Sequence, residues 1–284
     1  MARQNSHWTK ANCKMQIILS RKGFDTQYGG QASPIMPDGN LLSLPIPAKN
    51  ETLKFSDLTF KGKTYLEILK ELNPNSNIKD NYTCHLDPDL RSDIIHRENG
   101  WQPLFGQTGS AQGHLLRKGI KKDDLFLFFG TFKETETVNG IIKYKKHAPD
   151  IHLIFGYLQV GQIFSDIRNL PKEFQYHPHA QMRFEGDKNN CIYKAAETLS
   201  FNTSLDGAGC FSFSDKLVLT KSGLSKSRWE LPELFRNIEM SYHTQKSFKA
   251  DYFQSAAKGQ EFIIEENKKV TDWATELILS GTKK

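Results

Sequence analysis

The stretch "DLFLFFG", Asp124–Gly130, is the clearest indication of how this 284-residue chain folds. Its apolar residues run without alternation, which is typical of a strand buried on both faces. A longer apolar run follows at "IHLIFGYLQVGQIF", Ile151–Phe164, and contains Gly156 and Gly161. Because glycines inside a strand mark bulges or sharp bends, we expect this second strand to curve strongly.

Shorter elements surround these two strands. Apolar runs predict further strands at Met15–Ser20, Asn40–Pro47 and Glu261–Ile264. Apolar spacing of three to four residues predicts helices over Thr64–Leu72 with Thr64 as N-cap, over Ser110–Lys118 with Gly119 at its end, and over Val270–Ile278. Strands outnumber helices and follow no regular alternation with them. This favours an α+β fold with a strongly bent mixed or antiparallel sheet over a doubly wound α/β fold.

The composition is that of a soluble protein, with 38% apolar and 25% charged residues. No apolar stretch approaches the roughly 18 residues that a membrane span needs, and the polar N-terminus lacks the apolar segment of a signal peptide. We therefore expect a cytoplasmic protein without a membrane partner. We also expect a disordered tail over residues 1–14 and a single domain with flanking helices and long ordered loops over residues 15–284.

Charge and cysteine content narrow the classes of partner and site. The net charge is +6 and the pI about 9.0, which is compatible with a polyanionic partner such as nucleic acid. None of the four cysteines forms a CxxC pair, so neither a zinc knuckle nor a disulfide framework is indicated. The residues point to no particular cofactor.

A glycine-rich segment, "FGQTGSAQGH" (Phe105–His114), lies directly before and within a predicted helix. Gly109 and Ser110 would open that helix, where free backbone N–H groups and the helix dipole favour an anion. No Gly-Lys-Ser/Thr follows, so this is not a P-loop, and no strong strand signal precedes it as in a dinucleotide fingerprint. A turn without a ligand is the alternative. His114 would face the same end of the helix, either in a functional or in a structural role.

Polar residues also follow the first predicted strand, in "LSRKGFD" (Leu19–Asp25). Strand ends open onto crevices in which ligands bind. Arg21 could bind a phosphate with two parallel hydrogen bonds, Lys22 could add a point charge, and Asp25 could accept a hydrogen bond from a base or a sugar hydroxyl. The alternative is a solvated turn with a local Arg–Asp pair.

Two short segments carry histidines and aspartates at alternate positions. In "HLDPDL" these are His85, Asp87 and Asp89, and in "YHPHA" they are His177 and His179. On extended chain such residues share one face and could present metal ligands if the two segments met. Surface turns held by proline and Asx hydrogen bonds are the favoured interpretation, so we assign no metal ligand. The chain also lacks HExxH and GxSxG, which excludes standard zinc proteases and serine hydrolases.

Taken together, several motifs resemble the third of the nucleotide modification associated domain families. They are "IILSRKGFD", "FGQTGSAQGHLLRKGI", "HLIFGYLQVGQI", "YHPHA", "GAGCFSFSDKLVLT" and "SRWELPELF", which run in order over residues 16–265. That family is placed, mainly by genomic context, among bacterial and phage systems that modify bases in DNA. The resemblance implies that nine residues occupy signature positions: Arg21, Lys22, Asp25, Gly30, Ser33, Gly109, His114, Asp124 and His179.

A looser resemblance concerns the architecture. An apolar strand led by acidic residues, a variable hairpin and the strand "HLIFGYLQVGQI" are similar to the core of PUA-like domains, including the ASCH and EVE types. Those domains are small bent barrels that hold RNA or a modified base. The resemblance implies a PUA-like barrel as the second candidate for the core. Asp123-Asp124 stands where such domains have Gly-Asp, and the loops are longer than in a minimal barrel.

These observations lead to one functional prediction with two alternatives. The protein is expected to modify bases of nucleic acid, with DNA favoured, and to bind a nucleotide or an extruded base in a cationic crevice. Asp25 and His114 are the expected acid and base. The expected phosphate or nucleotide contacts are Arg21, Lys22, Gly30, Ser33, Gly109, Ser110, Asp124 and His179. The alternatives are a non-catalytic reader of modified bases and an interaction module that binds other proteins of a DNA modification or defence system.

Overall fold

The computed structural model describes residues 15–25, 28–76 and 78–281, so the expected tail at residues 1–14 lies outside the described part. One large mixed sheet organises the fold, with parallel pairing of β1 and β2 to β8 and antiparallel pairing elsewhere. The predicted α+β fold with a bent mixed sheet is confirmed. The main path of the sheet runs β17 (Glu261–Ile264), β1 (Ile17–Arg21), β8 (Leu125–Val138), β10 (Ile151–Phe164), β11 (Asn190–Ala195) and β7 (Leu104–Thr108).

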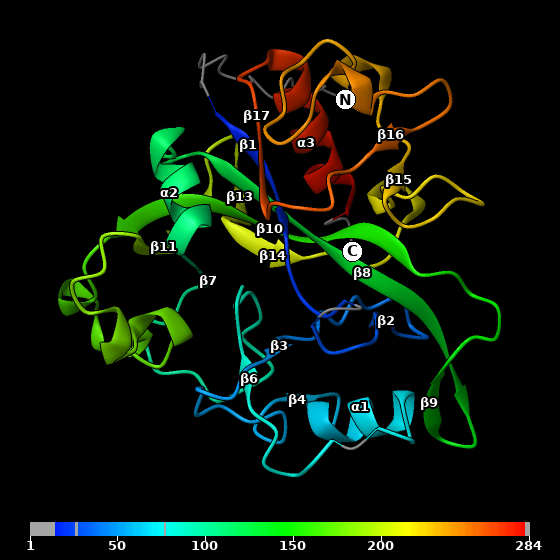
Figure 1. The fold of residues 1–284 in the computed structure, drawn as a ribbon. Coiled ribbons are helices and arrows are strands. Elements are labelled where there is room, and N and C mark those ends of the chain that lie inside the picture. Colours follow the sequence, from blue (N-terminus) through cyan, green and yellow to red (C-terminus); the bar gives the residue numbers. More distant parts are fainter. Residues whose placement is uncertain (1–14, 26–27, 77, 282–284) are drawn as a thin grey trace, which may run out of the picture.

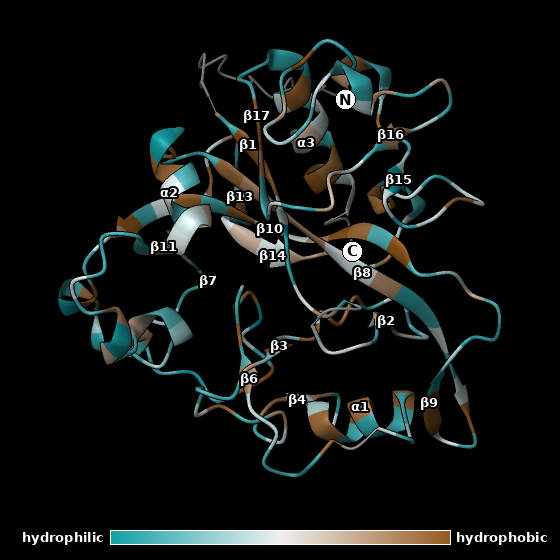
Figure 2. Ribbon diagram, in the orientation of Figure 1, coloured by the Kyte–Doolittle hydropathy of each residue, from teal (hydrophilic) through white to brown (hydrophobic). Residues whose placement is uncertain are grey.

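β8 is the central strand, and Figure 1 shows it crossing the molecule from the side of α2 to a hairpin beside α1. The expected two-sided burial is confirmed, since Phe126, Leu127 and Phe128 are all fully buried. Leu127 pairs with Leu19 of β1 on one side and with Tyr157 of β10 on the other. Figure 2 shows apolar residues along β1, β17 and the first half of β8, where the main core lies.

The bends expected in β10 occur at both glycines. The pairing register shifts between Ile154 and Gly156 against β8, and between Val160 and Gln162 against β11. A Cβ on Gly156 would lie 2.6 Å from Leu90 Cδ1, and one on Gly161 would lie 2.6 Å from the Ala195 carbonyl oxygen. The chain therefore needs bare backbone at these two positions for the sheet to curl.

The curled sheet does not close. Its two edge strands approach each other through side chains, because Gln107 Nε2 of β7 donates to Glu261 Oε1 of β17 at 2.6 Å. Within the described residues no backbone ladder joins β7 to β17. The sheet is thus open, and the PUA-like barrel, our second candidate for the core, is not formed.

Three α-helices flank the sheet: α1 (Tyr65–Leu72), α2 (Gly109–Arg117) and α3 (Lys268–Gly281). α1 begins with the expected N-cap, since Thr64 Oγ1 accepts from the Glu67 N–H and Glu67 accepts from the Thr64 N–H. α2 follows β7 without a loop and ends where Gly119 adopts a φ of +69°. No helix in the described ranges has both the length and the apolar character to cross a membrane.

The remaining strands are short. The expected strand at Asn40–Pro47 is wrong over most of its length: Asn40 and Leu41 make only isolated bridges, and Ile46–Pro47 alone forms β3. The other strands are β2 (Ser33–Ile35), β4 (Thr59–Phe60), β5 (Lys63–Thr64), β6 (Cys84–His85), β9 (Ile141–Tyr144), β12 (Thr198–Leu199), β13 (Asn202–Asp206), β14 (Ala208–Cys210), β15 (Arg228–Trp229) and β16 (Phe253–Gln254).

Candidate functional site

A buried carboxylate at the start of β17 connects the end of β1 to the start of α2. The Glu261 side chain is fully buried, and its Oε1 lies 3.2 Å from Lys22 Nζ. The same oxygen accepts from Gln107 Nε2 at 2.6 Å, while Gln107 Oε1 accepts from the N–H of Thr108, the N-cap residue of α2. The two segments that the sequence analysis expected to form one crevice therefore meet at Glu261.

Lys22 lies inside this junction rather than on the surface. Its side chain is 9% exposed, and Nζ lies 4.3 Å from the centre of the Phe105 ring. Asp87 Oδ2 is 4.0 Å from Nζ on the other side. A charge this deeply buried is stable only when it is paired, and Glu261 and Asp87 supply that pairing.

His114 approaches the same carboxylate from α2. Its ring packs edge-on against Tyr242, with 5.0 Å between the ring centres. Burial lowers the pKa of His114, with Arg117 and Lys118 acting in the same direction and Glu261 opposing them. Within the described residues, neither His114 Nε2 nor Glu261 Oε2 has a hydrogen-bond partner, although both atoms are buried. These atoms are free to bind a polar guest.

Arg21 and Asp25 lie beyond Lys22 and interact locally. The Arg21 guanidinium donates to the carbonyl oxygens of Ala256 at 2.6 Å and Ala257 at 3.1 Å. Burial lowers the pKa of Arg21, and the charge of Asp25 opposes this. Asp25 Oδ1 also accepts from the Tyr28 N–H at 2.8 Å. Arg21 thus fixes the loop before β17 to the end of β1.

The other residues predicted as nucleotide contacts are not all in one place. Gly109 opens α2 as expected, but its N–H donates to the Asn189 carbonyl oxygen at 2.8 Å, while Ser110 is exposed. Ser33 Oγ accepts from the backbone of Leu44, which makes it part of the packing around β2. Gly30, with a φ of +74°, closes the turn that Asp25 begins.

Asp124 is at the opposite end of the β1–β8 pair from Lys22. Its two carboxylate oxygens accept from the backbone N–H groups of Gln16 and Lys121, at 2.9 Å and 2.8 Å. Burial raises the pKa of Asp124 against these hydrogen bonds. The carboxylate therefore holds the turn that leads into β8, and it does not reach the junction at Glu261.

The two histidine-bearing segments do meet, on the far side of Lys22 from His114. His85 Nε2 and His179 Nε2 are 3.2 Å apart. His177 Nε2 lies 3.5 Å from Asp87 Oδ1, and both of those side chains are at least 96% buried. The expectation that these segments form surface turns is wrong, because the strand β7 packs on them and covers them.

Gly106 explains why this arrangement is sterically allowed. A Cβ at Gly106 would lie 2.2 Å from His179 Cδ2 and 2.9 Å from His177 Cε1. The Gly106 N–H donates to Asp87 Oδ1 at 2.6 Å. The first glycine of the "FGQTG" motif therefore makes room for two buried imidazoles, a role that the sequence analysis did not assign to it.

Each imidazole is held by an oxygen acceptor on its second nitrogen. His85 Nδ1 contacts Glu51 Oε1 at 2.8 Å, and His179 Nδ1 contacts Asn190 Oδ1 at 2.8 Å. Burial lowers the pKa of His179 to about 4. His85, Asp87 and His179 each direct one potential ligand atom to a common centre, with those atoms within 4.8 Å of one another.

Sequence reasoning missed three residues of this region. Glu261 carried a signal, because it is an acidic residue at the start of the apolar run "EFII" that forms a strand. Gln107 and Glu51 carried none, because a single polar residue in a loop or a short strand is common. Their roles depend on contacts between segments more than 100 residues apart in the chain.

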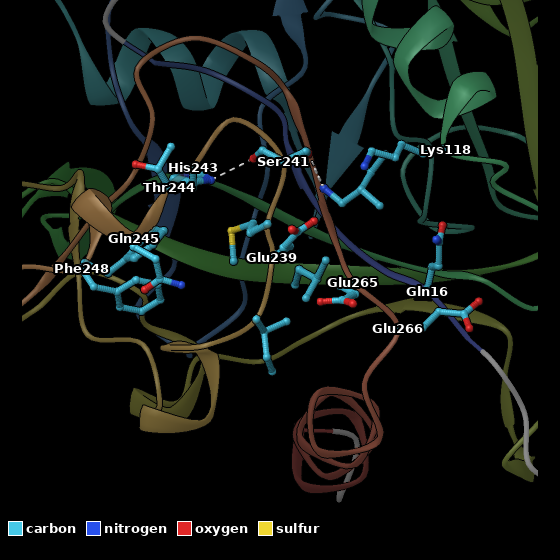
Figure 3. Close-up of a pocket in the computed structure, with 15 residues that line it drawn as sticks. Gln16, Lys118, Glu239, Ser241, His243, Thr244, Gln245, Phe248, Glu265 and Glu266 are labelled. Atoms are coloured by element: carbon cyan, nitrogen blue, oxygen red, sulfur yellow. Dashed lines mark hydrogen bonds between the residues drawn. The ribbon is translucent and has the colours of Figure 1, made fainter.

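A cavity of about 630 Å³ lies at the other end of β1 (Figure 3). Gln16, which precedes β1, and Glu265 and Glu266, which follow β17, line it together with Glu239 and Lys118. Three carboxylates against one lysine repel a phosphate. This cavity is therefore separate from the junction at Glu261 and is poorly suited to a nucleotide.

Comparison with known proteins gives one match. The family model described as "Nucleotide modification associated domain 3" matches residues 16–265, a range that includes the junction at Glu261 and both histidine segments. No curated protein and no solved structure matches the chain.

Proposed function

Since the chain belongs to the nucleotide modification associated domain 3 family, we propose that it acts in base modification of nucleic acid, with DNA as the favoured substrate. The proposed binding site for a nucleotide or an extruded base is the junction at Glu261, where β1 ends and α2 begins. The observation that carries the proposal is the convergence of Lys22, Gln107 and His114 on this one carboxylate.

The junction offers polar groups suited to a base. Glu261 Oε2 accepts hydrogen bonds, while His114 Nε2 can donate or accept depending on its tautomer. A flipped base presents donors and acceptors on its pairing edge, so these two atoms could bind it. His114 is also the group best suited to move a proton near neutral pH.

Phosphate binding is proposed at the beginning of α2. Ser110 is exposed, Gly109 has open space around it, and no side chain caps the first turn. The helix N-terminus favours an anion. His114 lies five residues further along, about 7.5 Å by the helix rise of 1.5 Å per residue. Arg21, Lys22 and Asp25 would support this site from the end of β1, since their own charges are engaged in protein contacts.

The test compares nucleosides from the DNA of cells that contain the protein, lack it, or contain His114→Ala. We expect a nucleoside that depends on the protein and disappears with His114→Ala, while His96→Ala, which removes an exposed histidine, leaves it unchanged. An unchanged profile combined with tight binding of a modified oligonucleotide would instead identify a reader. An unchanged profile with only weak, salt-dependent binding would refute nucleotide recognition altogether.

A further inference from the structure

We propose that His85, Asp87 and His179 bind one divalent first-row transition-metal ion. The first support is the spacing of the imidazole nitrogens, whose Nε2 atoms are 3.2 Å apart. Two nitrogens bound to one ion at 2.0–2.1 Å in tetrahedral geometry would be separated by about 3.3 Å. The rings are thus placed as two ligands of a single ion.

The second support is the hydrogen bonding on the other side of each ring. His85 Nδ1 faces Glu51 Oε1, a carboxylate oxygen that can only accept. His179 Nδ1 faces Asn190 Oδ1, and the orientation of that amide is fixed because Asn190 Nδ2 donates to the His179 carbonyl oxygen. Both Nδ1 atoms therefore carry the hydrogen.

It follows that the two Nε2 atoms direct lone pairs at each other. Two acceptors at 3.2 Å gain nothing from this contact and repel, whereas a cation between them binds both. Metal-bound histidines characteristically donate their other N–H to a carboxylate or an amide oxygen, as His85 and His179 do. A proton shared between the two nitrogens is the competing arrangement, and the experiment below separates the two.

Asp87 completes the set of ligands. Its Oδ1 accepts from the Gly106 N–H at 2.6 Å, and its Oδ2 lies on the side of Lys22. His177 Nδ1 accepts from the His179 N–H, so its Nε2 carries the hydrogen and points to Asp87 Oδ1 at 3.5 Å. The carboxylate is therefore oriented by two donors. Two imidazoles and one carboxylate suit Zn²⁺ or Fe²⁺ and leave positions for water or a substrate oxygen.

This inference is independent of nucleotide binding, and it is tested on the full chain without nucleic acid. After treatment with a chelator, the protein is titrated with Co²⁺ and with Zn²⁺, and bound metal is counted by mass spectrometry. We expect saturation at one ion per chain. His85→Gln should weaken binding at least tenfold, and Glu51→Gln, which removes the carboxylate behind His85, should weaken it about tenfold to a hundredfold.

Two controls keep folding and adventitious binding apart from the result. His96→Gln, an exposed histidine elsewhere, should bind the ion as the wild type does. His85 is the most exposed of the three ligands, so its variant should retain the circular dichroism spectrum of the metal-free wild type. X-ray absorption of the zinc-loaded wild type should show nitrogen and oxygen ligands with two imidazoles, whatever the variants do.

Three results would overturn the proposal. They are a lack of saturable binding of Co²⁺, Zn²⁺ and Fe²⁺ at micromolar concentration, unchanged affinity in folded His85→Gln, and sulfur in the first coordination sphere, which would point to Cys84 instead. Failure here would leave the nucleoside comparison unaffected, since that experiment examines His114. Conversely, stoichiometric metal binding with an unchanged nucleoside profile would support the metal site and not the proposed function.

Discussion

At the scale of single residues, Gly106 allows the most direct test of the buried histidine cluster. Gly106→Ala would place a methyl group 2.2 Å from the His179 ring, which strand β7 and the segment around His177 hold in place. Overpacking of this kind costs about 1–3 kcal/mol. We expect the free energy of unfolding in urea to fall by that amount or more.

Gly113, in the same glycine-rich stretch, supplies a matched control with the opposite sign. It lies within α2, and a Cβ there would meet the flexible end of Arg117 at 3.2 Å. Alanine is favoured over glycine inside a helix by about 0.8–1.0 kcal/mol. Gly113→Ala should therefore leave stability unchanged or raise it, and a loss equal to that of Gly106→Ala would contradict the specific role of Gly106.

His152 allows a prediction about pH. Burial among the core residues of β10, with Arg21 and Lys226 nearby, lowers the pKa of His152 to about 3, and its Nδ1 accepts from the Trp229 indole at 3.1 Å. The unfolded chain takes up this proton near pH 6.5, so stability is lost as the pH falls from about 6.5 towards 3, by up to about 1.4 kcal/mol per pH unit.

The measurement is the free energy of unfolding between pH 7 and pH 4.5 for the wild type and for His152→Gln, which keeps an acceptor for Trp229. We expect a smaller loss on acidification in the variant, whatever its stability at pH 7. Equal slopes for the two proteins would mean that His152 does not contribute to the acid sensitivity.

At the scale of elements, sequence patterns were sufficient wherever the cause of a structure is local. Thr64 was predicted as an N-cap because its hydroxyl can accept from the third helical N–H, and it does so in α1. The bulges at Gly156 and Gly161 were predicted from the interruption of an apolar strand. The strand at Asn40–Pro47 was not formed because Pro45 and Pro47 have no N–H to donate, which leaves only Ile46 to pair with β6 in both directions.

The cap of α1 leads to a prediction at this scale. Thr64→Ala removes the acceptor for the Glu67 N–H, a hydrogen bond of 3.1 Å. Loss of a threonine N-cap costs about 1 kcal/mol. The urea midpoint should fall accordingly, and Thr64→Ser, which keeps the hydroxyl, should restore most of it. A serine variant as unstable as the alanine variant would show that the methyl group rather than the cap is responsible.

At the scale of the whole molecule, the candidate site could be predicted only in part. The sequence placed Lys22 at a strand end and a helix after Gly109, and these segments do meet. It could not place Glu261 between them, because that contact depends on β17 pairing with β1 while β7 curls round to approach it. It likewise could not bring His85 next to His179, 94 residues away in the chain. Contacts of this kind follow from strand order, which local patterns do not contain.

The Lys22–Glu261 pair tests whether the curl of the sheet depends on this buried contact. Removing one partner leaves the other charge unpaired in the interior, which typically costs 3–5 kcal/mol. Lys22→Met and Glu261→Gln should each destabilise the protein, and Lys22→Met also loses the contact with the Phe105 ring. The double variant should be less destabilised than the sum of the two, with a coupling of about 1–3 kcal/mol by urea unfolding. The exposed Lys268–Asp272 pair on α3 provides the control cycle and should show no measurable coupling. If the buried pair were as additive as the exposed one, Lys22 and Glu261 would not hold the edges of the sheet together, and the site built around them would have to be held by Gln107 alone.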